Sequence, residues 1–138
     1  MYLLDTSALY PLIKTLKENL LDYTNIITVL DLTLYETGNT VWKEWKRGLI
    51  KNLDKVLLMI EEVLKEINKV SIQAEDIKNI TKIAVKNNIT FYDAAYIYIA
   101  KKHNYTLVTE DKDLLKTYSK AITTKTLLKK LKHSNQLT

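Results

Sequence analysis

MYLLDTSAL, the first nine residues, contains the pattern that decides the fold. Tyr2-Leu3-Leu4 is a short apolar run, which predicts a buried strand, and Asp5-Thr6-Ser7 ends it. Helical periodicity follows from about Ala8 to Leu21. A short buried strand that leads directly into a helix is typical of α/β domains.

The same alternation continues along the rest of the chain. Apolar runs predict further strands at 26–30, 70–72, 105–108 and 121–122. Helical spacing predicts helices over about 32–47, 52–68, 75–86, 91–102, 111–118 and 124–132. The clearest, 52–68, has one apolar stripe: Leu53, Val56, Leu57, Ile60, Val63, Leu64 and Ile67. We therefore predict an α/β fold, a three-layer doubly wound sheet of about five mostly parallel strands flanked by helices.

The composition supports one helix-rich domain over residues 1–138 and excludes several functional classes. Two glycines and one proline are too few for the tight turns of an all-β fold. The absence of cysteine excludes disulfides, thiolate metal sites and cysteine nucleophiles, and two histidines cannot form a three-histidine zinc site. No apolar stretch is long enough to span a membrane and no signal peptide is visible, so we expect a cytoplasmic protein.

Four acidic residues stand near predicted strand ends and helix starts. Asp5 follows the first strand, and Asp111 follows the strand at 105–108. Asp93 begins the helix before that strand, and Glu36 lies about one turn into the helix 32–47. In a doubly wound parallel sheet, the carboxyl ends of strands and the amino ends of helices meet at one crevice, so we expect these side chains to converge.

Each acid also has a purely structural explanation when it is taken alone. Asp5, Asp93 and Asp111 could cap helices, and Glu36 could be a solvated helix residue. The apolar sequence neighbours of Glu36 and Asp93 favour a joint site instead. Clustered carboxylates repel one another unless a cation neutralises them, and oxygen ligands favour a hard cation such as Mg²⁺ or Mn²⁺. Such a cation can activate water and stabilise a phosphoryl group in transfer.

Four sequence blocks surround these acids: LLDTSAL (3–9), LYETGN (34–39), ITFYDAAY (89–96) and LVTEDKDL (107–114). In this order they resemble the motifs of the PIN-domain nucleases, in particular the VapC-type toxins of toxin–antitoxin pairs. The resemblance implies a Mg²⁺- or Mn²⁺-dependent endoribonuclease in which Asp5, Glu36, Asp93 and Asp111 bind the metal. It implies supporting polar roles for Thr6, Asn39 and Thr109. Asp113 stands where members often carry an additional acid, although it could equally stabilise its own helix.

The same resemblance implies partners. The VapC-type toxins bind a small antitoxin protein in a groove near the active site and often form homodimers. The helix 52–68 is a candidate partner surface, because its apolar stripe is long. Trp42 and Trp45 are expected in the core or in a partner groove.

The net charge of +5 is compatible with an RNA substrate. Lysines bind phosphates without reading sequence, and the candidate contacts are Lys43, Lys46, Arg47 and Lys116. A solvated surface explains these residues equally well.

Three alternatives remain from the sequence. The first is a PIN-type nuclease for RNA processing or for DNA, without a toxin role. The second is a non-catalytic module that binds a cation for structure or phosphorylation, and the third is an inactive PIN scaffold. The presence of all four acids argues against the last.

Overall fold

The computed structural model describes residues 1–136. Its elements, in chain order, are β1 Tyr2–Leu4, α1 Thr6–Leu16, the 3₁₀ helix η1 Lys17–Ile26, β2 Ile27–Leu30, α2 Asp31–Lys46, α3 Leu53–Glu66, β3 Asn68–Val70, the 3₁₀ turn η2 Ala74–Asp76, α4 Ile77–Asn87, α5 Phe91–His103, β4 Thr106–Val108, α6 Lys112–Thr117, β5 Ala121–Ile122 and α7 Thr124–Gln136. None of these helices is long and apolar enough to cross a membrane.

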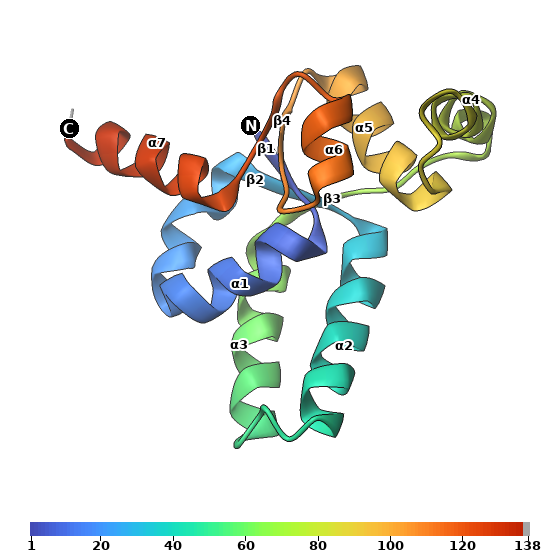
Figure 1. The fold of residues 1–138 in the computed structure, drawn as a ribbon. Coiled ribbons are helices and arrows are strands. Elements are labelled where there is room, and N and C mark those ends of the chain that lie inside the picture. Colours follow the sequence, from blue (N-terminus) through green and yellow to red (C-terminus); the bar gives the residue numbers. More distant parts are fainter. Residues whose placement is uncertain (137–138) are drawn as a thin grey trace.

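The strands form one parallel sheet in the order β3-β2-β1-β4-β5, with β1 in the middle (Figure 1). Leu3 pairs with Thr28 on one side and with Leu107 on the other. All strands therefore end at the same edge of the sheet. The predicted α/β fold with a doubly wound parallel sheet is confirmed.

Alternation along the strands divides the core into two layers of side chains. Leu4, Val29 and Val108 belong to one cluster, which also contains residues of α1, η1, α3 and α7. Leu3, Leu30 and Leu107 belong to the other, with residues of α4, α5 and α6. Successive strand residues point to opposite faces, so each face of the sheet is covered by helices and the domain has three layers.

The segment after β1 departs from the predicted single helix Ala8–Leu21. α1 ends at Leu16 because Lys17 takes a non-helical backbone conformation, with φ at 51° and ψ at −131°, and its N–H donates to the Ile13 carbonyl. The chain then continues as the 3₁₀ helix η1. The strand expected at 70–72 also lies earlier, at Asn68–Val70, where it pairs with the residues 28–30 of β2.

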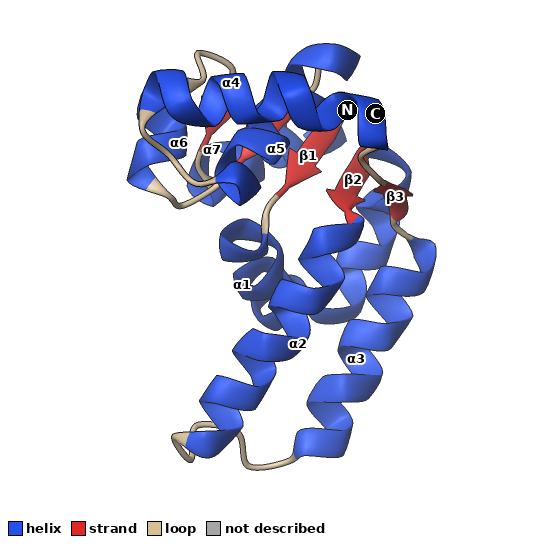
Figure 2. Cartoon of the chain, turned by 90° about the vertical axis from the view of Figure 1, so that its right-hand side faces the viewer, coloured by secondary structure: helices blue, strands red, loops and turns tan. Residues whose placement is uncertain are grey.

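α2 and α3 form a hairpin that extends away from the sheet (Figure 2). α2 buries Thr33, Thr37 and Val41, a stripe of four-residue spacing. Trp42 lies beside this stripe, and Trp45 continues it to the far end of the hairpin, which the body of the domain does not cover.

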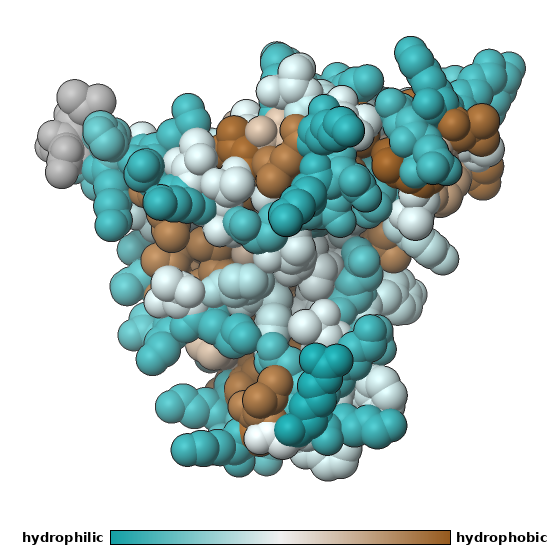
Figure 3. Space-filling model, in the orientation of Figure 1, coloured by the Kyte–Doolittle hydropathy of each residue, from teal (hydrophilic) through white to brown (hydrophobic). Residues whose placement is uncertain are grey.

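The expected core position of the two tryptophans is therefore wrong, since each is 52% exposed. Leu57 of the predicted α3 stripe is also exposed, at 44%. Hydrophobic side chains gather at this end of the molecule (Figure 3).

Candidate active site

Asp5 is fixed at the carboxyl end of the central strand by three hydrogen bonds. Its Oδ1 accepts from Ser7 Oγ at 2.6 Å and from the Ala8 N–H at 3.0 Å, which caps α1. Its Oδ2 accepts from Thr109 Oγ1, which follows the neighbouring strand β4. The Asp5 side chain is only 6% exposed, so both carboxylate oxygens are held in place by groups from two strand ends.

Hydroxyl groups connect Asp5 to the loop that carries Asp111. Ser7 Oγ lies 3.3 Å from Thr109 Oγ1 and accepts the Glu110 N–H at 2.9 Å. Thr109 Oγ1 accepts the Asp111 N–H at 3.0 Å. The positions of the first and the last predicted acid are thereby linked through two side chains.

Asp111 caps α6, which is the structural explanation that the sequence suggested for this residue. Its Oδ1 accepts from the Asp113 N–H at 2.8 Å and from the Leu114 N–H at 3.1 Å. Asp5 also caps a helix, so capping and membership of the acidic cluster coexist in both residues. Asp113 is exposed in the first turn of α6.

Asp93 does not cap its helix. Thr90 is the N-cap of α5, and its Oγ1 accepts the Asp93 N–H at 3.1 Å. The half-buried Asp93 carboxylate is therefore not used for capping.

Glu36 is oriented by hydroxyl groups from two other helices. Tyr96 of α5 donates to Glu36 Oε1 at 2.8 Å, and Thr6 of α1 donates to the same oxygen at 3.4 Å. The Tyr96 hydroxyl also lies 2.7 Å from Thr33 Oγ1. The expected apolar surroundings of Glu36 are only partly present, since Tyr35 is 79% exposed and the carboxylate of Glu36 is hydrogen-bonded to the hydroxyls of Thr6 and Tyr96.

Burial and mutual repulsion connect the four acids electrostatically. Burial raises the pKa of Asp5, the hydrogen bonds from Ser7, Thr109 and Ala8 oppose this, and the charge of Glu36 raises it further. Burial also raises the pKa of Asp93, and the charges of Asp111, Glu36 and Asp113 add to the increase. The neighbouring acids therefore make the ionised forms of Asp5 and Asp93 less favourable, as in many functional sites.

The donor set fits a hard divalent cation. Carboxylates and hydroxyls are the available ligands, and the charges that raise the pKa values of Asp5 and Asp93 are those that a cation would neutralise. Within residues 1–136, no group of three or more acidic or histidine side chains is already arranged to hold a metal ion.

A shallow groove with a volume of about 390 Å³ lies between α1 and α2 and includes Glu36 in its lining. Glu36, Asn39 and Lys43 line it from α2, and Thr6, Ser7 and Tyr10 contribute from α1. Near this groove, Glu44 accepts hydrogen bonds from Tyr10 at 2.5 Å and from Lys14 at 3.2 Å. Lys14 therefore compensates the Glu44 charge.

The four candidate RNA contacts are not brought together. Lys43 lies in the groove beside Glu36, whereas the Lys46 ammonium sits over the Trp42 ring, 5.1 Å from its centroid, toward the end of the hairpin. Arg47 follows α2. Lys116 lies on α6, where it lines a different depression together with Asp113.

Sequence reasoning missed Ser7 and Tyr96. Ser7 stands inside the first motif, two residues after Asp5, and this spacing is a signal for a hydroxyl that turns back to the acid. Tyr96 is three residues after Asp93, so the two side chains lie on nearby faces of α5. No local sequence pattern indicates that the Tyr96 hydroxyl reaches Glu36.

Comparison with known proteins places the chain in a family. The family profile described as PIN domain matches residues 2–120. Exonuclease VapC9 of Pyrobaculum aerophilum is 35% identical over 136 residues, which cover 94% of this chain and 95% of that protein. Ribonuclease VapC3 of the same organism is 36% identical over 96 residues, 68% of this chain and 72% of that protein. The crystal structure of PAE2754 from Pyrobaculum aerophilum matches with a TM-score of 0.86 at 32% identity, covering 96% of this chain and 89% of that one.

Proposed function

The chain belongs to the PIN-domain family, and from this premise we propose that it is a VapC-type ribonuclease, the toxin of a toxin–antitoxin pair. The observation that supports the proposal is the electrostatic coupling among the four acids: the charge of Glu36 raises the pKa of Asp5, and the charges of Asp111 and Glu36 raise the pKa of Asp93. The matching relatives are named as nucleases, which agrees with chemistry at such a site.

Asp5, Asp93, Asp111 and Glu36 hold Mg²⁺ or Mn²⁺ in this proposal. The cation supplies activation of water and stabilisation of the charge that develops on the phosphate. Thr109 and Ser7 keep Asp5 in one orientation, and Thr6 with Tyr96 keeps Glu36 in another. Asn39 contacts the substrate beside Glu36, and Asp113 contributes negative charge near Asp93.

We further propose cleavage within the RNA chain. The groove between α1 and α2 is lined by Glu36, and a second depression, between α2 and α5, is lined by Tyr35 and Tyr92, the sequence neighbours of Glu36 and Asp93. An RNA strand can therefore continue in both directions. Removal of nucleotides from an end is the second candidate, because one matching relative is named an exonuclease. A circular single-stranded RNA separates the two: an endonuclease cuts it, and an exonuclease leaves it intact.

Removal of one carboxylate charge tests the proposed site. Asp93→Asn and Asp5→Asn should each abolish Mg²⁺- or Mn²⁺-dependent cleavage of single-stranded RNA while the circular dichroism spectrum stays unchanged. Titration calorimetry with Mn²⁺ should show weaker binding in both variants. Asp54→Asn is the matched control, because Asp54 is an exposed first-turn acid of α3. Full activity in either site variant would contradict the assignment.

Single-stranded DNA in the same assay tests the alternative of a DNA-directed nuclease.

A small antitoxin protein is the expected partner, and a homodimer is the expected assembly. The exposed apolar residues near the end of the α2–α3 hairpin offer surface for such contacts: Trp42, Trp45, Leu49, Leu57 and Leu58. Growth arrest on expression, relieved by the small protein encoded beside this one, would support the toxin role. Cleavage that continues unchanged with that protein bound in excess would contradict it and leave the nuclease assignment intact.

A further inference from the structure

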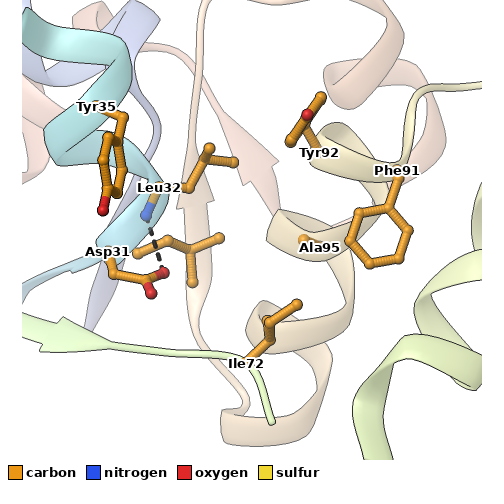
Figure 4. A pocket seen from close by; sticks show the side chains of 8 residues that line it. Asp31, Leu32, Tyr35, Ile72, Phe91, Tyr92 and Ala95 are labelled. Atoms are coloured by element: carbon orange, nitrogen blue, oxygen red, sulfur yellow. Dashed lines mark hydrogen bonds between the residues drawn. The ribbon is translucent and has the colours of Figure 1, made fainter. Parts of the chain in front are cut away.

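A second, apolar pocket lies between α2 and α5, the helices that carry Glu36 and Asp93. Its volume is about 220 Å³. Figure 4 shows Asp31, Leu32 and Tyr35 of α2 on one side, Phe91 and Tyr92 of α5 on the other, and Ile72 below them. Three aromatic rings therefore border a space between the two helices that carry Glu36 and Asp93.

Two residues that line the pocket are sequence neighbours of two of the four acids. Tyr35 immediately precedes Glu36, and Tyr92 immediately precedes Asp93. Successive residues of a helix point about 100° apart, so the tyrosines face the pocket while the acids face the cluster. A nucleotide whose phosphate lies at the acids has its base within reach of this space.

The pocket is lined by one carboxylate, that of Asp31, and one of its oxygens is available to a ligand. Asp31 Oδ1 accepts the Leu32 N–H at 2.9 Å, and this is the hydrogen bond that the dashed line marks in Figure 4. Among residues 1–136, no group donates to Asp31 Oδ2. Asp31 is exposed and outside the four motifs, so the acidic cluster does not account for it.

We propose that this pocket binds one unstacked base of the RNA beside the bond that is cut, and that Asp31 selects bases with an amino group. This inference rests on the proposed ribonuclease function. Aromatic rings stack on any base, which supplies affinity. An ionised carboxylate is acceptor-only and repels phosphate, so it suits the donor edge of a base.

Donor geometry then ranks the bases. Guanine presents two adjacent N–H donors that one carboxylate can accept, and cytosine and adenine present one amino group each. Uracil places carbonyl oxygens on both sides of its single N–H, and these oxygens oppose a carboxylate. We therefore expect a preference for guanine and a discrimination against uracil at one fixed position relative to the cleaved bond.

The test is to sequence cleavage products from a pool of randomised single-stranded RNA with Mn²⁺. Wild-type protein should show the base preference. Tyr35→Ala should lower kcat/KM by about ten-fold, since stacking contributes that order per base, whereas Tyr35→Phe should retain the wild-type rate. Asp31→Asn should lose the discrimination against uracil, because an amide presents donors as well as acceptors. Asp54→Asn is the matched control and should retain it.

The outcomes separate this inference from the proposed function. If wild-type protein cuts no RNA with any divalent metal, the ribonuclease assignment fails. If it cuts RNA and the Tyr35 and Asp31 variants show the wild-type rates and preference, the base pocket is wrong. If these variants instead weaken binding of the neighbouring small protein while RNA cleavage is unchanged, the pocket serves a protein partner and the proposal is overturned.

Discussion

Glu36 is positioned by a residue that belongs to no acidic motif. Tyr96 lies on another helix, 60 positions away in the chain, and donates its hydroxyl hydrogen to Glu36 Oε1. The same hydroxyl contacts Thr33, one turn before Glu36. Burial raises the pKa of Tyr96, and the adjacent Glu36 charge raises it further, so the hydroxyl remains protonated at neutral pH. Tyr96 is therefore a positioning residue for a proposed metal ligand.

Tyr96→Phe should weaken the metal site without removing any carboxylate. Groups that orient metal ligands typically contribute 10- to 100-fold in affinity, so we expect the Mn²⁺ concentration for half-maximal RNA cleavage to rise by about ten-fold. Loss of the buried hydrogen bonds should also lower the free energy of unfolding by about 1–2 kcal/mol.

Tyr98→Phe is the matched control for this variant. Tyr98 is on the same helix and also donates to a carboxylate, Asp76, at 2.7 Å, but it lies away from the cluster. This control should lower thermal stability and leave the Mn²⁺ requirement unchanged. Equal shifts in the Mn²⁺ requirement of both variants would indicate a general structural effect and contradict the positioning role.

At the scale of elements, the spacing of apolar residues is sufficient to predict most of the helices and strands. Buried strands such as Tyr2–Leu4 and amphipathic helices such as α3 follow from local patterns, and acids after parallel strands follow from topology. Trp45 shows the limit, because a stripe predicts which face can be buried but not where the covering structure ends. The contact between Tyr96 and Glu36 depends on how two helices meet, which no local pattern records.

The start of α4 gives a prediction about pH. Asp76 accepts the Gln73 N–H at 2.8 Å and the Tyr98 hydroxyl, and Lys102 Nζ lies 3.6 Å away. These contacts hold the pKa of Asp76 below its ordinary value of 3.8, with the Gln73 hydrogen bond as the largest cause. The ionised form therefore stabilises the fold above the unfolded-state pKa, and this stabilisation is lost as pH falls through the lower folded-state pKa.

Asp76→Asn should lower Tm by a few degrees at pH 7 and progressively less as the pH falls below about 4. Thermal unfolding followed by circular dichroism between pH 2.5 and pH 7 measures this difference. Asp54→Asn, which changes an exposed acid in the first turn of α3, should give a smaller and flatter difference. A difference between wild type and Asp76→Asn that persists undiminished at the lowest pH would contradict the role of the Asp76 charge.

At the scale of the whole molecule, the net charge of +5 conceals an uneven distribution. If the four clustered acids are set aside, the chain has 12 acidic residues and 21 basic residues. The acids gather at one edge of the sheet, and lysines spread over the helices around it. Such a surface attracts a phosphate chain over a long range, while only a lysine beside the cluster can hold a phosphate next to the bond that is cut. Lys43 has that position, because it lines the groove that contains Glu36.

Lys43→Ala should therefore weaken RNA binding more than removal of a lysine elsewhere. The measurement uses an Asp93→Asn background, which binds without cutting, and follows the dissociation constant of a short RNA against salt concentration. Loss of one phosphate contact should reduce the slope of log K against log salt by about one. Lys82→Ala, on the exposed face of α4, is the matched control and should keep the wild-type slope because it lies outside the groove. An equal change in both variants would mean that RNA responds only to the overall positive field, and the groove between α1 and α2 would then have no special part in binding.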